Sequence, residues 1–368
     1  MKNLVILLIA YLAISCAPDN KPKKKDPVES FEITEQTDRY LKRFEVGSEN
    51  YDQYSLLLPI ENGTHIKKGD ALIFNSVALA SMCMLEGFDS ERVVLWDAVK
   101  GLQKNGTFIR HPESQAKLSI SKDQLTGFFY LAAIAKYTDC DPVVGDMPAI
   151  LASLKQYGVS HDWEMATGKT DRSTTLWLDF HILKAIYGMY DLENSDFDLS
   201  RSIHYVEASS IVAPQLAYMA YLCRSGEDKL ACVDGKPVPV FGNHLLALTI
   251  AIFAVDSRVS KHPLYKKSKT NEWLKNISEV GDEFGYRNWL FFSMYSYFTG
   301  KGKGYKNNID DFLVNWFPDQ TGEEKDHAVL GWGCSEYIWQ RVPPETCSGS
   351  PVYYTGIDFL HLYSWSRM

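Results

Sequence analysis

Residues 71–86 read ALIFNSVALASMCMLE and decide the fold class of this 368-residue chain. The stretch consists mostly of helix-forming residues, and apolar side chains occur on nearly every side of the helix that they would form. A helix without a polar face must be buried on all sides. Residues 125–135, 176–190, 211–222, 245–255 and 289–298 have the same character. The sequence therefore predicts an all-α protein with about six buried helices.

Amphipathic segments with a charged stripe alternate with these buried segments. They cover residues 90–103, 147–157, 267–277 and 309–317, and a shorter polar piece lies near 197–203. Alternation of buried and half-exposed helices is typical of an (α/α)6 toroid, in which outer helices wrap an inner ring. The uneven spacing of the buried segments argues against a solenoid of equal repeats. We therefore expect a toroid, with an irregular multi-helix bundle as the alternative.

The connections between the predicted helices are of two lengths. Those that leave a buried segment are short: 87–89, 138–145 and 256–261. Those that arrive at a buried segment are long: 105–121, 160–175, 224–242, 278–287 and 318–356. Long connections in compact domains usually serve function. In a toroid they would all lie at one end, beside helix N-termini, which favour anions.

The N-terminus predicts export. A short positive start and the apolar run Leu4 to Leu12 are followed by Ala13-Ile14-Ser15-Cys16. This segment resembles a bacterial lipobox, which implies a signal peptide over 1–15, cleavage before Cys16 and lipidation of Cys16. The alternative is an ordinary signal peptide with an incidental cysteine. Prolines and lysines then predict a flexible tether over 16–35 and a single domain over 36–368. We expect a cell-envelope protein anchored to a bacterial membrane, at the outer membrane or the periplasmic face.

Composition limits the classes of partner. Hydrophobic residues make up 45% of the chain and aromatic residues 13%, which is enough for a large core. The formal net charge is −8, and no basic tract is longer than Lys23-Lys24-Lys25 of the tether. Nucleic acid is therefore not an expected partner. The expected partners are the membrane, through the lipid anchor, and a carbohydrate.

Six cysteines remain after Cys16, an even number that agrees with an oxidising compartment. Short loops separate Cys223 from Cys232 and Cys334 from Cys347, so each of these pairs predicts a local disulfide. Cys83 and Cys140 would then pair between helices, although six cysteines permit about fifteen connectivities. No Cys-x-x-Cys occurs and no histidine stands at ligand spacing, so no metal site is expected. No phosphate-binding glycine motif occurs either, and no cofactor is expected.

The long arriving connections and the helix starts next to them carry acids, bases and tryptophans that suit a sugar-binding cleft. The predicted acid/base residues are Asp123, Glu164, Asp171 and Glu283. The predicted substrate-binding residues are Arg110, Lys122, Gln124, Trp163, Arg172, His244, Tyr286, Arg287 and Trp289. The arginines and lysine would bind acidic sugar groups, and the rings would stack on sugar faces. Asp123 has an alternative role at a helix N-terminus, where carboxylates are favoured.

Because motifs of serine, cysteine and phosphate chemistry are missing, two catalytic interpretations remain: carboxylate acid–base chemistry, and proton abstraction by histidine, tyrosine or arginine. The helix alternation resembles six-hairpin glycosidases and polysaccharide lyases, with no specific family signature. That resemblance implies a glycan-active enzyme, a hydrolase or a lyase, with its site at the loop-rich end. The alternative is a non-catalytic envelope lipoprotein that binds a glycan or a partner protein.

Overall fold

The computed structural model describes residues 30–61, 63–66, 68–104, 107–113, 122–160, 176–192, 232–233, 236–237, 241–279, 289–301, 306–315, 329–330, 350–351 and 355–368. Most of these residues are helical. Strands occur among them only as short antiparallel ribbons, which pair β1 (Ile60–Glu61) with β2 (Thr64–His65), β3 (Gln103–Lys104) with β4 (Thr107–Phe108), β5 (Cys232–Val233) with β6 (Lys236–Pro237) and β7 (Val329–Leu330) with β8 (Ser350–Pro351). The predicted all-α class is confirmed.

The apolar segments form the central helices. These are α3 (Ala71–Cys83), α5 (Lys122–Thr138), α7 (Leu176–Met189), α9 (Phe241–Val259), α11 (Trp289–Thr299) and α13 (Ile357–Arg367). Every residue of α3 is buried, as its sequence predicts. The predicted helix over 211–222 lies outside the described residues. The last long connection leads to α13, which is buried over most of its length.

The charged segments form the remaining helices. These are α2 (Ser30–Leu41), α4 (Asp89–Gly101), α6 (Val143–Ser160), α10 (Lys267–Glu279) and α12 (Lys306–Asn315), with single 3-10 turns at Lys42–Phe44 and Lys68–Asp70. Four of them match the predicted amphipathic segments, while α2 starts inside the predicted tether. The polar piece 197–203 lies outside the described residues.

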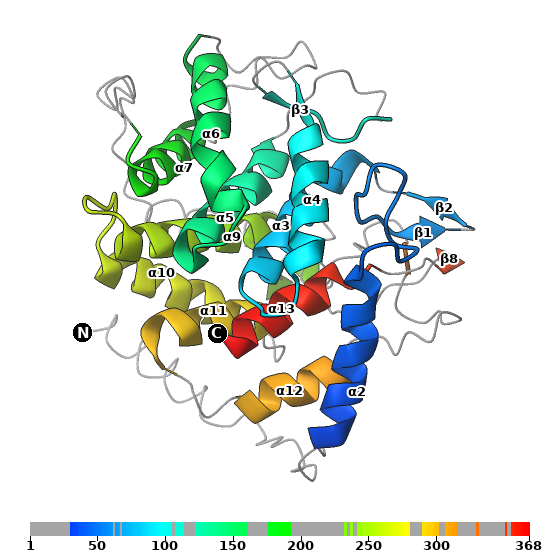
Figure 1. Ribbon diagram of the computed structural model, residues 1–368. Helices are drawn as coiled ribbons and strands as arrows, with labels where there is room; N and C mark the ends of the chain where they lie inside the picture. Colours follow the sequence, from blue (N-terminus) through cyan, green and yellow to red (C-terminus); the bar gives the residue numbers. More distant parts are fainter. Residues whose placement is uncertain are drawn as a thin grey trace, which may run out of the picture.

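The central helices contact one another in chain order. α3 packs along α5, α5 contacts α7, α7 contacts α9, α9 contacts α11 and α11 contacts α13. Helix α13 also contacts α3, and α5 contacts α9 directly (Figure 1). The charged helices pack against them: α4 on α3, α6 on α5, α10 on both α9 and α11, and α12 on α13.

The carboxyl-terminal ends of five central helices lie together and form what we call the carboxyl-terminal edge. The Tyr137 hydroxyl of α5 is 2.9 Å from the Tyr297 hydroxyl of α11. Arg258 of α9 donates from Nη2 to the carbonyl oxygen of Phe298 at 2.7 Å. The ring of Trp365 in α13 lies against Tyr297 and Phe298. Helices α5, α9, α11 and α13 therefore end at the same side, and the disulfide described next adds α3.

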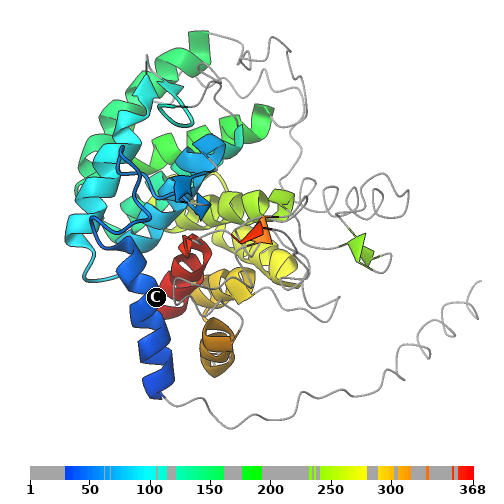
Figure 2. The same cartoon turned by 90° about the vertical axis from the view of Figure 1, so that its right-hand side faces the viewer.

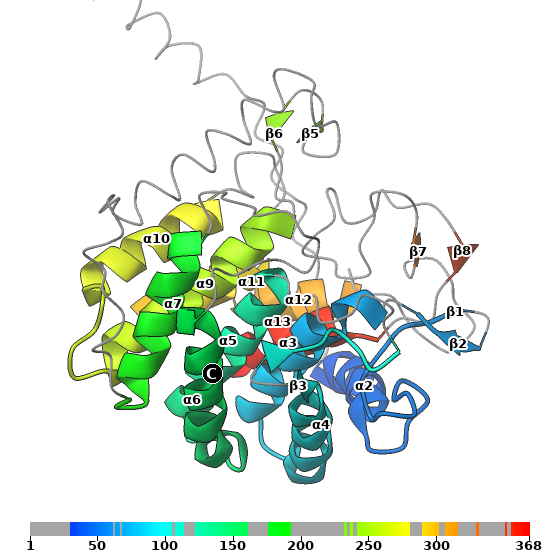
Figure 3. The same ribbon diagram turned by 90° about the horizontal axis from the view of Figure 1, so that it is seen from above.

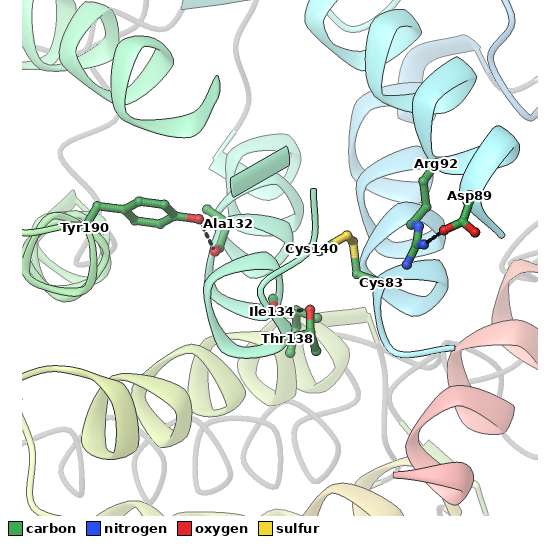
Figure 4. The surroundings of a disulfide bond; sticks show 8 residues. All are labelled: Cys83, Asp89, Arg92, Ala132, Ile134, Thr138, Cys140 and Tyr190. Carbon is green, nitrogen blue, oxygen red and sulfur yellow. Dashed lines mark hydrogen bonds and ion pairs between the residues drawn. A yellow bond between two sulfur atoms is a disulfide. The ribbon is translucent and has the colours of Figure 1, made fainter. Parts of the chain in front are cut away.

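A disulfide joins Cys83 at the end of α3 to Cys140 just after α5, as the sequence predicts (Figure 4). The two Cα atoms are 5.4 Å apart, and 57 positions separate them in the chain. Thr138 next to it donates its hydroxyl to the Ile134 carbonyl, and Tyr190 of α7 donates to the Ala132 carbonyl, each at 2.9 Å. Cys232 lies in β5, whereas Cys16, Cys223, Cys334 and Cys347 lie outside the described residues.

The tightest helix crossing is that of α3 and α5. A Cβ atom on Gly127 would lie 2.7 Å from Cγ1, 2.9 Å from Cα and 3.0 Å from the carbonyl oxygen of Ile73. Two of these atoms belong to the backbone, which cannot rotate away. Glycine at this position therefore allows the two helices to touch along their backbones.

The first described helix packs on the last. The ring of Tyr40 in α2 stacks on Phe359 in α13 with centroids 4.0 Å apart and planes at 7°. Gly356 precedes α13 with φ +81°, and a Cβ atom there would lie 2.9 Å from Tyr40 Cδ1. The left-handed backbone and the close ring both require glycine. Figure 2 shows α2 on the same side of the molecule as the C-terminus.

Two of the short β-ribbons lie on one side of the helix assembly, and the C-terminus lies on the other (Figure 3). The ribbons β5–β6 and β7–β8 lie on the side opposite to the C-terminus (Figure 3). β6 precedes α9 and β8 precedes α13, so this is the side where the central helices begin. Within the described part of the chain, no helix has the length and hydropathy needed to cross a membrane.

Candidate functional site

Four buried side chains from α5, α9 and α13 meet inside the helix assembly. They are Tyr130, His244, His361 and Trp365, and we call them the central cluster. Each is at most 2% exposed. The rings of His244 and His361 lie edge to face with centroids 6.2 Å apart, and Tyr130 and His361 have centroids 5.5 Å apart. Helices α9 and α13 thus contribute polar rings to an apolar interior.

Hydrogen bonds fix the protons of three members of the central cluster, Tyr130, His361 and Trp365. The indole N–H of Trp365 donates to the Tyr130 hydroxyl oxygen at 2.9 Å and lies 3.3 Å from His361 Nε2. The Tyr130 hydroxyl lies 2.9 Å from His361 Nε2. Because the indole can only donate, the consistent arrangement has Tyr130 O–H donating to an unprotonated His361 Nε2. His361 is then the neutral tautomer with its proton on Nδ1.

Burial keeps the central cluster uncharged. Desolvation lowers the pKa of His244 to about 3. Desolvation, helped by His244, also lowers the pKa of His361 well below its usual range. The pKa of Tyr130 is raised by burial. The central cluster therefore holds neutral donors and acceptors at neutral pH, and an acid or base that exchanges protons must come from other residues.

The beginning of α3 is held by side chains from neighbouring segments. Gln124 Oε1, in the first turn of α5, accepts the backbone N–H of Ile73 at 3.0 Å. This N–H belongs to the first turn of α3, where no partner within the helix exists. Arg110 Nη1 donates to the Gly69 carbonyl at 3.1 Å in the turn before α3. The two predicted substrate-binding residues thus make structural contacts at this end.

A second buried polar pair joins the segment before α3 to the connection between β4 and α5. His111 Nε2 is 2.7 Å from Asp52 Oδ2, and both side chains are at most 5% exposed. His111 Nδ1 accepts the N–H of Glu113 at 3.1 Å, so the Nε2 proton points at Asp52. The carboxylate of Glu113 binds Lys68 and Gln53, and the Lys68 bond holds the pKa of Glu113 below its usual range. Both His111 nitrogens are therefore engaged in holding loops together.

The structure places the other predicted site residues as follows. Asp123 lies in the first turn of α5 and is half-buried, and Lys122 is the first residue of that helix. Trp289 begins α11, half-buried, with its ring edge-on to Phe292 at 5.9 Å and tilted to Phe312 at 6.4 Å. The remaining predicted residues, Trp163, Glu164, Asp171, Arg172, Glu283, Tyr286 and Arg287, lie outside the described residues.

The structure therefore brings His244 into a cluster whose other members sequence reasoning missed. His361 and Trp365 stand four residues apart in an apolar helix, and that spacing places them on one face. Tyr130 lies within an unbroken apolar run and gives no separate signal. Asp52, the partner of His111, lies 59 positions from it in the chain. Among the residues that the structure describes, no group of His, Cys, Asp and Glu side chains could hold a metal ion.

Comparison with known proteins gives no family assignment. No protein-family model, no curated protein and no solved structure matches this chain.

Proposed function

We propose that this protein is a lipid-anchored cell-envelope protein built as an (α/α)6 toroid, and that it acts on a glycan where the central helices begin. The observation that carries the proposal is the circuit of contacts from α3 through α5, α7, α9, α11 and α13 back to α3. Such a circuit collects the long arriving connections at one end, and these carry the acids, bases and tryptophans of the predicted cleft.

Carboxylate chemistry is the reaction that suits these residues. In glycoside hydrolysis one carboxylic acid protonates the leaving oxygen and a second carboxylate activates water or attacks the sugar. Asp123 and Glu164 are our candidates for this pair, with Asp171 and Glu283 next. Asp123 has support from its half-buried position in the first turn of α5, the side on which the cleft is proposed. The neutral central cluster would line the floor beneath it.

The predicted cations narrow the substrate class. Arg110, Lys122, Arg172 and Arg287 would neutralise carboxylate or sulfate groups, so we propose an acidic polysaccharide. Trp163, Tyr286 and Trp289 would position the sugar rings, whereas His244 is buried in the central cluster and is no longer a candidate for this role. Hydrolysis and β-elimination remain the two candidate reactions. Hydrolysis suits any acidic sugar, whereas β-elimination requires a uronic acid, whose carboxyl group acidifies the C5 proton that is removed as the 4-O-linked sugar leaves.

The test is turnover of a panel of acidic and neutral envelope glycans. Hydrolysis is read from new reducing ends and elimination from the ultraviolet absorbance of an unsaturated product. Asp123→Asn or Glu164→Gln should each lower the rate by a factor of about 10²–10⁴, as expected for loss of an acid–base group. Asp139→Asn, at an exposed site at the carboxyl-terminal edge, is the matched control and should leave the rate unchanged. Full activity in the Asp123→Asn, Glu164→Gln double variant would overturn these assignments.

The anchor has its own test. Cells expressing the full chain should incorporate a labelled fatty acid into the protein, and Cys16→Ser should abolish the label. Labelling that persists in Cys16→Ser would contradict the lipid anchor at this residue.

A non-catalytic binding protein is the second candidate. The observation that favours it is the central cluster, whose fully buried, hydrogen-bonded rings are typical of a structural core. In that case a glycan would bind without product formation, and Asp123→Asn would change the affinity but no rate.

A further inference from the structure

A group of exposed basic residues stands out on this acidic protein. Lys261, His262, Lys266 and Lys267 lie in and just after the connection from α9 to α10, and Lys301 follows α11. All five are exposed. We call them the basic corner. The chain as a whole has a formal net charge of −8, so this concentration of positive charge contrasts with the composition of the rest.

The helix ends that carry the basic corner are joined by half-buried polar contacts of Arg258. Arg258 at the end of α9 donates from Nη2 to Asn271 Oδ1 of α10 at 2.9 Å and to the Phe298 carbonyl of α11 at 2.7 Å. Its guanidinium also lies over the Phe298 ring, 4.5 Å from the centroid. One arginine thus fixes the ends of three helices. Lys267 lies one helical turn before Asn271 and Lys301 three residues after Phe298, so both are positioned by this junction.

Neighbouring acids offset only part of this charge. Asp191 lies 3.5 Å from Lys261, and Glu272 lies 3.3 Å from Lys269 of α10. Asp256 is 1% exposed and accepts the Leu264 N–H at 2.7 Å, so it faces the protein interior. Other exposed acids of the carboxyl-terminal edge, Asp89 and Asp139, lie at the connections that follow α3 and α5. These two acids follow α3 and α5, and Asp89 is paired with Arg92, whereas the basic corner follows α9 and α11.

We propose that the basic corner docks on anionic lipid headgroups of the membrane that holds the anchor. The proposal rests on the lipid anchor of the proposed function. It is supported by the side of the molecule involved: the carboxyl-terminal edge lies where α2, the helix that starts inside the predicted tether, and the C-terminus are found (Figure 2). Each lysine near an anionic membrane surface raises the affinity about five-fold, and the effect extends about one Debye length. Contact at this edge turns the beginnings of the central helices away from the bilayer.

The test uses the full lipidated protein in two kinds of vesicle, pure phosphatidylcholine and phosphatidylcholine with phosphatidylglycerol. A water-soluble acetylating reagent modifies exposed lysines, and mass spectrometry measures each rate. We expect Lys266, Lys267 and Lys301 to react about five-fold more slowly on the anionic vesicles at low salt, and equally on both at high salt. Lys104, an exposed residue of β3 beyond the far end of α4, is the internal control and should react equally throughout.

Charge reversal adds a second measurement. Lys266→Glu together with Lys267→Glu should remove the protection of Lys301, whereas Lys104→Glu should retain it. Equal rates on both vesicles would overturn the proposal, and so would equal protection by dextran sulfate without vesicles, which indicates a site for soluble polyanions. Flotation with phosphatidylcholine vesicles reports the anchor independently. If the protein floats with these vesicles but its lysines show no protection on the anionic ones, the lipid anchor is supported and the docking of the basic corner is contradicted.

Discussion

The interior of this helix assembly and its carboxyl-terminal edge are held together by different chemistry. In the interior, the neutral rings of the central cluster are buried, and Tyr130, His361 and Trp365 exchange hydrogen bonds. At the edge, a disulfide joins α3 to α5, and Arg258 joins α9, α10 and α11. The interior is thus sensitive to protons, because its histidines must stay uncharged, and the edge is sensitive to reductant. Each region can therefore be weakened while the other is left intact.

Acid should weaken the interior, with the largest effect of the three changes considered. Unfolded histidines titrate near pH 6.5, whereas burial lowers the pKa of His244 to about 3 and that of His361 well below the usual range. Between these values the unfolded chain binds protons that the folded chain does not. The contribution of the two histidines to the free energy of unfolding is fully present above pH 6.5. At lower pH it should decrease by about 1.4 kcal/mol per pH unit for each histidine. Urea unfolding between pH 7 and 4.5 measures this slope. His244 alone should lower the free energy of unfolding by about 3 kcal/mol over that range, and His361 acts in the same direction.

Two variants identify the source of that slope. His244→Gln should reduce it by about 1.4 kcal/mol per pH unit, because one titrating group is lost. His262→Gln, at an exposed site, should leave it unchanged. A slope that is the same in His244→Gln and the parent protein would contradict the assignment to the central cluster.

Removal of the disulfide should weaken the edge by a comparable but smaller amount. Cys83 and Cys140 close a loop across 57 positions, and loss of such a crosslink costs about 4 kcal/mol of unfolding free energy through the unfolded chain. The variant Cys83→Ala, Cys140→Ala should show this loss in urea without reductant. With reductant, the free energy of unfolding of the parent protein should fall close to that of the variant. The dependence of stability on pH should be the same in the parent protein and the variant. A variant as stable as the oxidised parent would show that the edge does not depend on the disulfide.

Packing between α3 and α5 gives the smallest effect and responds to neither pH nor reductant. Gly127→Ala places a methyl group against the backbone of Ile73 and should cost about 1–3 kcal/mol in urea unfolding. Gly101→Ala is the matched control, since a Cβ atom there has no neighbour within 4 Å, and should change stability by less than about 0.5 kcal/mol. An equal change in both variants would contradict a clash at Ile73, because helix propensity alone favours alanine over glycine at either position.

The fold class and helix positions were predictable because burial leaves a direct pattern in the sequence. The unbroken apolar run at 71–86 predicts α3, and the charged stripe at 267–277 predicts α10. The pairing of Cys83 with Cys140 was the one that remained once the two short-loop pairs, Cys223 with Cys232 and Cys334 with Cys347, had been assigned. Helix α13 gave a weaker signal, since Asp358, His361 and Ser364 interrupt its apolar pattern although all three are buried.

The candidate site was predictable only where a local pattern existed. His244 stood out as a polar residue at the start of an apolar helix, and the structure buries it beside His361. Its partners come from segments more than 100 positions away, and no periodicity reports such pairing. Gln124 was expected to face a cleft, yet its oxygen caps α3. A polar residue at a helix start satisfies an unpaired backbone group as readily as it binds a ligand, and sequence alone does not separate the two.

The stack of Tyr40 on Phe359 determines how a mechanical load would enter the protein. Tension applied to the residues before α2 reaches α12 and α13 first, because α2 packs on both. Helix α13 passes the load to α3 and α11 together, so several helix interfaces must shear at once before any helix can be pulled out. The force needed to unfold the protein should therefore be higher when it is pulled from its N-terminus than when it is pulled from a peripheral loop.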